Sequence, residues 1–207
     1  MSKIYKLIIF LPFLILGCKP NVIEENKVIQ RINSLDMNIF SMRGEKIYSI
    51  ISPYSSFDKN QLKFQSKNTN INIFNGEEIK YIINSDESTL SDNNKLLKLT
   101  GNVKLKIFKR DEDTLYADNF IWKIEETNYQ LEGNIRFENK NIILNSSKAK
   151  LDSDNIIEFF NPVKYIIKDE NNENKYEITS ENAYYNLNTE SVSFKSKDKR
   201  VKSIIYF

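Results

Sequence analysis

A pattern of two short segments that recurs about every thirty residues constrains this chain more than any other feature. In the first segment a small residue follows an apolar one by two positions, and the intervals between these small residues are 33, 32, 29 and 34. The five small residues are Ser52, Ser85, Ala117, Ser146 and Ser180. The second segment alternates apolar and polar residues, as a strand with one buried face requires. Such a repeat, with two strands per unit, predicts stacked β-structure.

Turn-forming residues lie in register at the middle of the second segment, as Gly101, Gly133 and the pair 161–162. Glycine inside a strand indicates a bulge or a sharp bend. No helical pattern offers a cover for the apolar strand faces, so these faces must meet each other. The pattern favours a β-solenoid or a jelly roll, and we expect an all-β fold: an elongated, open, twisted β-jelly roll of stacked antiparallel two-strand repeats. We expect the small residues to leave room along one wall.

The N-terminus has the features of an export signal. Two lysines precede an apolar run over residues 7–16, and about ten helical residues rise only roughly 15 Å, which is too short to span a membrane. The ending Leu16-Gly17-Cys18 resembles a bacterial lipobox, in which the cysteine is lipid-modified. We expect a lipoprotein signal peptide over 1–17 and a lipid anchor at Cys18; an uncleaved signal-anchor is the alternative.

We expect a tether or linker over 18–38 and the β-jelly-roll domain over 39–207. Within the tether, the apolar residues at 28, 29, 32 and 35 have helical spacing, so a short amphipathic helix is the other possibility.

Composition excludes most hydrolase chemistry. The chain has no histidine and one cysteine, which excludes histidine-containing triads, disulfides within the chain and Cys-based zinc sites. We expect no catalytic residue, no metal and no cofactor. Without residues 1–17 the chain has 28 basic and 28 acidic residues, so a nucleic-acid partner has little support. A carbohydrate-active enzyme that uses carboxylates near 111–113 remains a rival interpretation.

Three strand motifs carry a family resemblance, namely Leu99-Thr100-Gly101-Asn102-Val103, Leu115-Tyr116-Ala117-Asp118 and Leu131-Glu132-Gly133-Asn134-Ile135. They resemble the "L-x-G-N-V" and "L-x-A-D" strands of the OstA/LptA/LptC family of bacterial lipopolysaccharide transport proteins. Residues 40–52 are similar to the opening of LptC in particular. The resemblance implies a periplasmic protein without enzymatic activity, anchored to the inner membrane more readily than to the outer one.

By this resemblance the protein receives lipopolysaccharide from an inner-membrane ABC transporter in an apolar groove and passes it to an LptA-like protein. The acyl chains of lipid A would lie against a lining made of Leu99, Val103, Leu105, Leu115, Ala117, Phe120, Trp122, Leu131, Ile135, Phe137, Leu144, Ala149, Leu151, Phe159, Val163, Ile178, Ala183 and Tyr185. Partners would pair with strand edges at Ile47, Ser49, Ile51, Val192, Phe194, Ile204 and Tyr206. An LptA-like bridge and a structural envelope lipoprotein without lipid cargo are the alternatives.

Overall fold

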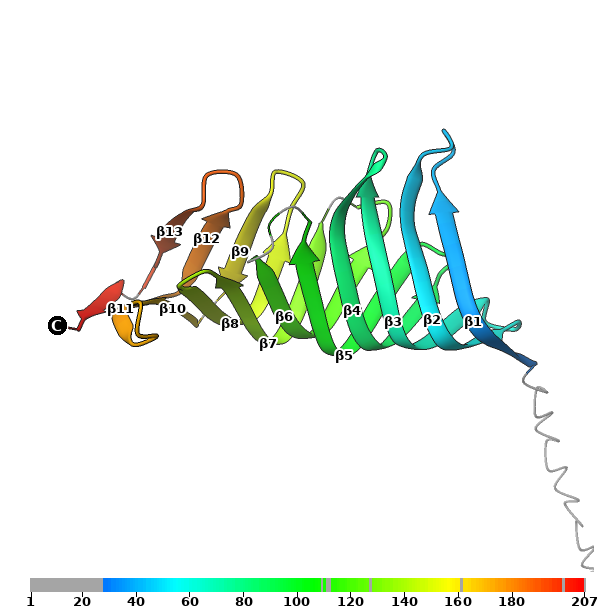
Figure 1. Cartoon of the computed structure of the whole chain (residues 1–207), viewed down its shortest axis with the longest axis horizontal. Coiled ribbons are helices and arrows are strands. Elements are labelled where there is room, and N and C mark those ends of the chain that lie inside the picture. The colour runs from blue at the N-terminus through cyan, green and yellow to red at the C-terminus, as the bar shows by residue number, and fades with distance from the viewer. Residues whose placement is uncertain are drawn as a thin grey trace, which may run out of the picture.

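The computed structural model describes residues 28–206 except 109, 111–112, 127, 161 and 199. These residues form one antiparallel sheet of 14 strands, and they contain no helix. The strands are β1 (Ile29–Phe40), β2 (Lys46–Asp58), β3 (Lys63–Asn75), β4 (Glu78–Ser91), β5 (Leu96–Ile107), β6 (Thr114–Lys123), β7 (Tyr129–Asn139), β8 (Ile142–Leu151), β9 (Ile156–Phe160), β10 (Val163–Lys168), β11 (Asn174–Ser180), β12 (Asn182–Asn186), β13 (Ser191–Lys195) and β14 (Lys202–Ile205). They follow one another along the long axis, with β1 at one end and β11 and β13 towards the other (Figure 1).

The sheet is folded along one corner into two layers. Strands β1 to β8 are continuous across the corner, whereas β9 and β10, β11 and β12, and β13 and β14 are the two halves of interrupted strands. Layer 1 is the half of the sheet on one side of the corner, and its last strands are β10, β11 and β14. Layer 2 is the half on the other side of the corner, and its last strands are β9, β12 and β13. Strand β8 shows the division, because residues 142–145 pair with β10 and residues 148–151 pair with β9.

Glycine and asparagine make the corner. Gly101 and Asn102 both have positive φ, at 78° and 44°, and the register of β5 with its neighbours shifts there. The Asn102 Nδ2 donates a hydrogen bond of 2.7 Å to Oδ2 of Asp86 on the adjacent strand. A Cβ atom at Gly101 would lie 2.6 Å from that Oδ2 atom, so only glycine fits. The same arrangement recurs at Gly133 with Asp118.

The small residues of the repeat also lie at the corner. Four of them are serines whose hydroxyls donate hydrogen bonds of 2.8–3.0 Å to the carbonyl oxygen two residues later, namely Ser52, Ser85, Ser146 and Ser180. Because the ladder is interrupted where a strand bends, a short hydroxyl side chain satisfies backbone groups there. These four serines therefore have a hydrogen-bonding role at the corner, which the expectation that they leave room along a wall did not include.

Aromatic side chains pack across the interior, the space between the two layers. The ring centroids of Tyr48 and Trp122 are 5.4 Å apart, and those of Tyr81 and Tyr129 are 5.5 Å apart. The first pair joins β2 of layer 1 to β6 of layer 2, and the second joins β4 to β7. Each of these strands of layer 1 thus faces a strand of layer 2 that comes several strands later in the chain. The two layers are therefore skewed relative to each other.

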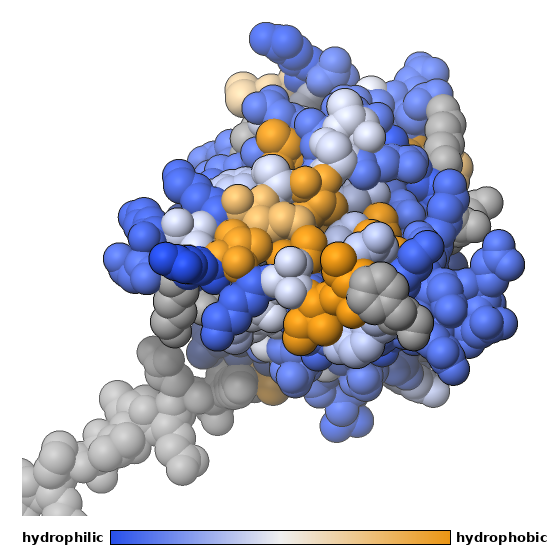
Figure 2. Space-filling model, turned by 90° about the vertical axis from the view of Figure 1, so that its left-hand side faces the viewer, coloured by the Kyte–Doolittle hydropathy of each residue, from blue (hydrophilic) through white to orange (hydrophobic). Residues whose placement is uncertain are grey.

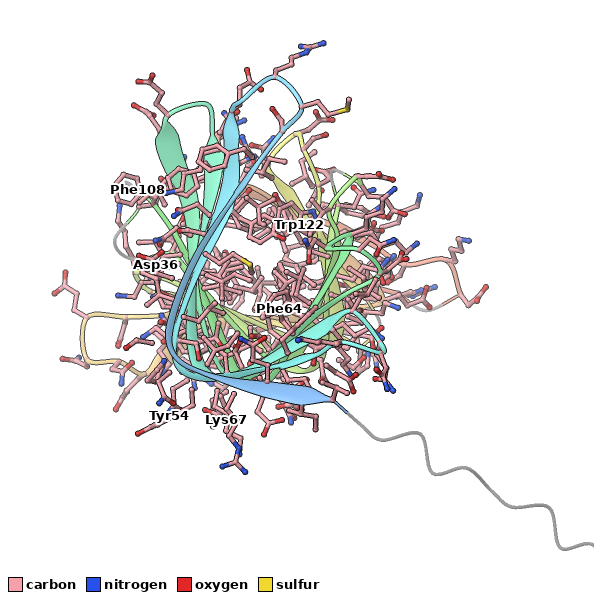
Figure 3. The ribbon with its side chains drawn as sticks, turned by 90° about the vertical axis from the view of Figure 1, so that its right-hand side faces the viewer. Asp36, Tyr54, Phe64, Lys67, Phe108 and Trp122 are labelled. Carbon is pink, nitrogen blue, oxygen red and sulfur yellow. The ribbon has the colours of Figure 1, made fainter. Side chains whose placement is uncertain are left out.

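The skew leaves each end of the molecule partly uncovered. At the β1 end Phe64 of layer 2 is only half-buried, and at the other end Ile167 and Ile178 of layer 1 are half-buried. Figure 3 looks from the β1 end; Phe64 and Trp122 point into the interior, whereas Tyr54 and Lys67 point away from it. The sheet is not closed, since β1 pairs only with β2, β13 only with β12 and β14 only with β11 among the described strands. An open, all-β architecture is confirmed.

Residues 29–38, which were expected in a tether or a helix, form most of β1. Ser34 has a φ of 56° at the corner, and the alternation of inward and outward residues shifts by one position there. Ile32 and Leu35 therefore both face inward although they are three residues apart, a spacing that imitates a helix. The predicted signal peptide and Cys18 lie outside the described residues. In the described part of the chain, nothing forms a helix of the length and apolarity needed to cross a membrane.

Candidate functional site

The interior is lined by rows of side chains that run along the molecule, because the strand register aligns every inward-facing position with its neighbours. One row is continuous through ten strands: Ser55, Ser66, Ser88, Leu99, Phe120, Leu131, Ala149, Phe159, Ala183 and Phe194. We name it the Ser55–Phe194 row. A parallel row in layer 1 contains Leu105, Leu115, Phe137, Leu144 and Ile178 among its members.

The residues predicted to line a groove lie on these inward faces. Each of them is at most 5% exposed except Ile178, which is half-buried. Over its middle the interior is therefore filled by its own side chains. Inward-facing side chains that are only half-buried lie at the two ends of the interior.

Hydroxyl groups line the interior near the β1 end. In the Ser55–Phe194 row, Ser55 Oγ donates to Ser66 Oγ at 2.8 Å, and Ser88 Oγ lies 3.0 Å from Thr69 Oγ1. Ser66, Ser88 and Thr69 are all at most 5% exposed. The sequence patterns gave Ser55, Ser66 and Ser88 no role of their own; their recurrence at inward positions of β2, β3 and β4 is the signal that distinguishes this end.

Two tyrosine hydroxyls in the interior have no hydrogen-bond partner among the described residues. They belong to Tyr48 and Tyr81, which are both fully buried. Burial raises the pKa of both phenols, so they are neutral hydroxyls at physiological pH. The sequence pattern does not reveal these hydroxyls, because an inward tyrosine fits an apolar strand pattern as well as phenylalanine does.

A polar cluster joins the layers on their open side, away from the corner. Arg110 Nη1 lies 3.4 Å from Asp113 Oδ2 in layer 1 and 3.4 Å from Glu190 Oε1 beyond β12 in layer 2. The Asn139 amide donates to Asp113 and, at 3.1 Å, to the hydroxyl of Tyr185 in layer 2. Burial raises the pKa of Asp113, while Asn139 and Arg110 oppose the shift. The cluster holds the open side together at this position.

Apolar side chains gather on the end face formed by the last strands (Figure 2). Ile205 is 50% exposed and Tyr176 is 36% exposed, and Phe194 is half-buried against the core. Val192 and Phe194 lie on β13, Ile204 lies on β14, and Tyr206 is the residue that follows β14. Both strands leave one edge unpaired within the described part of the sheet, as a partner edge requires.

The partner edge expected at Ile47, Ser49 and Ile51 is wrong. These residues lie on β2, whose main chain pairs with β1 on one side and with β3 on the other. Within the described sheet the free edge at this end belongs to β1, and the helix-like spacing of its apolar residues concealed this strand in the sequence.

The described residues contain no group of three or more metal-ligating side chains. Two ion pairs join neighbouring strands, Lys148 with Glu132 at 3.0 Å and Lys164 with Glu177 at 3.0 Å. The interior is lined by apolar side chains, with the serine, threonine and tyrosine hydroxyls described above at a few positions.

Comparison with known proteins points in the same direction as the strand motifs. No curated protein matches the sequence. Among solved structures, LptH from Pseudomonas aeruginosa, described as the LptA-homologous periplasmic component of the lipopolysaccharide transport device, is 14% identical. The similarity covers 61% of this chain and 94% of that one, with a TM-score of 0.48. Residues 17–154 match the family model described as lipopolysaccharide-assembly, LptC-related, which confirms the resemblance of the strand motifs: the chain belongs to the LptC-related family.

Proposed function

We propose that this protein is a membrane-anchored periplasmic component of lipopolysaccharide export. It receives lipopolysaccharide from an inner-membrane ABC transporter, holds the acyl chains of lipid A between its two layers and passes them to an LptA-like protein. Family membership supports the general role. The observation that carries the proposal is the continuity of the inward rows from β2 to β13 in a sheet whose ends are not closed.

The energetics favour partial and transient binding. Burial of one acyl chain of about ten methylenes stabilises by roughly 8 kcal/mol. Six fully buried chains would make release too slow without an external source of energy. Because the interior is already filled over its middle, an entering chain must displace protein side chains, and this cost offsets part of the gain. A component that relays its cargo requires such a balance.

The free edges supply positions for the partners. We assign β13 and β14 to the LptA-like protein, since their unpaired edges lie beside an exposed apolar end face. The unpaired edge of β1 faces the transporter, and a lipid on Cys18 holds this end near the membrane. Strand addition at a sheet edge supplies main-chain hydrogen bonds without enclosing the cargo.

Photo-crosslinking tests the cargo. A benzophenone amino acid replaces Phe64 at the β1 end, Phe159 in the middle or Phe194 at the far end, and the matched control replaces the outward-facing Tyr116. We expect crosslinks to lipopolysaccharide in cells from the three inward positions and not from Tyr116. Crosslinks from no inward position, in folded variants, would favour a structural lipoprotein without cargo.

Two further measurements test anchoring and the partner edge. Incorporation of radiolabelled palmitate should be lost in Cys18→Ala, and this variant should leave the membrane fraction.

A truncation after Lys195 removes β14 and should abolish co-purification with an LptA-like protein while β1 to β13 stay folded. Unchanged co-purification would assign the partner to another edge.

A further inference from the structure

Tyr48 and Tyr81 lie on one inward row of layer 1. Tyr48 pairs in register with Ile73, and Ile73 pairs with Tyr81. The two side chains are thus two strand spacings apart, about 10 Å. Neither hydroxyl has a hydrogen-bond partner among the described residues, and both are shielded from solvent. Two identical polar groups therefore face the interior at a regular distance.

Other buried polar atoms of aromatic residues in the interior do have partners. The Tyr185 hydroxyl accepts a hydrogen bond from Asn139 at 3.1 Å, and the Trp122 Nε1 donates to the Glu126 carbonyl at 3.1 Å. An unpaired buried hydroxyl destabilises a fold, whereas phenylalanine would fill the same volume without this cost. The hydroxyls of Tyr48 and Tyr81 contribute nothing visible to folding, which indicates a role with a bound molecule.

The surroundings of the two hydroxyls suit a chain with an isolated polar atom. Tyr48 packs edge-on against Trp122, and Tyr81 packs edge-on against Tyr129. Tyr81 also lines a surface pocket bounded by Lys80 of layer 1 and Asn188 beyond β12 of layer 2. The pocket brings the surface close to Tyr81, whose side chain is itself fully buried. At each of the two positions a ligand would meet an aromatic ring and one neutral hydroxyl.

We infer that the Tyr48 and Tyr81 hydroxyls donate hydrogen bonds to the carbonyl oxygens of ester- or amide-linked acyl chains. The inference rests on the proposed function and adds a basis for selection among lipids. An acyl carbonyl satisfies the buried hydroxyl, whereas an alkyl ether or a plain hydrocarbon chain leaves it unpaired. The interior therefore selects acylated lipids over alkyl lipids of equal length.

Two soluble lipids that differ only in the carbonyl oxygen of the acyl chain test the inference. Lauroyl lysophosphatidylcholine carries an ester carbonyl, and its O-dodecyl ether analogue does not. Titration calorimetry with the full chain, below the micellar concentration, should show about fivefold tighter binding of the ester, the value of one neutral hydrogen bond. The variant Tyr48→Phe/Tyr81→Phe should lose this preference while it keeps its affinity for the ether.

Controls separate a direct role from a structural one. Tyr48→Phe and Tyr81→Phe should each raise the midpoint of thermal unfolding, because each removes an unpaired hydroxyl. Tyr185→Phe should lower that midpoint, because it breaks an existing hydrogen bond. Tyr116→Phe, on the outward face, should leave the ester preference intact.

The outcomes distinguish this inference from the proposed function. Equal affinities of the wild-type protein for the two lipids, or a preference that persists in the double variant, would overturn the inference and leave lipid transport standing. Failure of the wild-type protein to bind either lysolipid or purified lipopolysaccharide would overturn both.

Discussion

The β1 end and the middle of the molecule share one backbone plan but line the interior with different side chains. In the Ser55–Phe194 row, the strands near the β1 end contribute Ser55, Ser66 and Ser88, while the following strands contribute residues such as Leu99 and Phe120. Register and corners are alike in both regions, so the chemistry of the interior varies independently of the fold. The middle is a packed core that stabilises the protein, and the β1 end is a partly covered, hydroxyl-bearing opening.

Truncation of a large side chain should separate the two regions most clearly. Phe137 is fully buried and packs against Phe159 and Tyr185; Phe137→Ala should lower the free energy of unfolding by about 3–5 kcal/mol. Phe64 at the β1 end is only half-buried, and Phe64→Ala should cost about 1–2 kcal/mol. Urea denaturation measures both values. Equal losses would show that the β1 end is as tightly packed as the middle.

Replacement of glycine by alanine should lower the free energy of unfolding more at the corner than in a turn at the β1 end. Gly133 has a φ of 76°, and a Cβ atom there would overlap the Asp118 side chain; Gly133→Ala should cost about 2–3 kcal/mol. Gly44, in the turn between β1 and β2, has a φ of 82° and open space around it, so Gly44→Ala should cost only about 1 kcal/mol. Denaturant unfolding compares the two, and Asp118→Ala should recover part of the loss at Gly133. No recovery would contradict the overlap.

Exchange of hydroxyl and methyl groups within the Ser55–Phe194 row should be unfavourable in both regions. Ala149→Ser places a hydroxyl at a fully buried position beside Leu131 and Phe159 and should cost about 1–3 kcal/mol. Ser88→Ala removes the contact with Thr69 and should cost about 1 kcal/mol. Thermal unfolding measures both variants. A stabilising Ser88→Ala would show that the contact between Ser88 and Thr69 does not stabilise the fold.

The smallest effect should be a pH dependence at the polar cluster on the open side. The pKa of Asp113 is raised by burial, so its neutral form is favoured in the folded state. Stability from this group is complete below the unfolded pKa of about 4 and is lost as pH rises through the folded pKa. Asp113→Asn should therefore be more stable than the wild-type protein at pH 7, and the difference should vanish near pH 3. Thermal midpoints across this range test the sign; a variant that is less stable at pH 7 would show that Arg110 and Asn139 outweigh burial.

Particular residues show how far sequence reasoning reached. The alternation around Gly101 and Gly133 predicted strands, buried faces and a bend, because these depend on neighbouring residues along one strand. The same reasoning failed at β1, where Ser34 shifts the alternation at the corner and the apolar spacing imitates a helix. It also gave the repeat serines the role of spacers, since their hydrogen bonds form only when the strand has bent.

The sequence by itself determined the class of fold, the inward direction of the apolar strand residues predicted to line the groove, and the family, because a period of two and a repeated corner motif are local properties. Only the tertiary structure decided that each strand of layer 1 faces a strand of layer 2 from several strands later in the chain. It also decided that side chains fill the middle of the interior, and that β1 rather than β2 is the free edge of the described sheet. Those outcomes depend on twist and bend accumulated over many strands, which no local pattern encodes. The unpaired hydroxyls of Tyr48 and Tyr81 became visible for the same reason: a hydrogen-bond partner is missing only with respect to the whole fold.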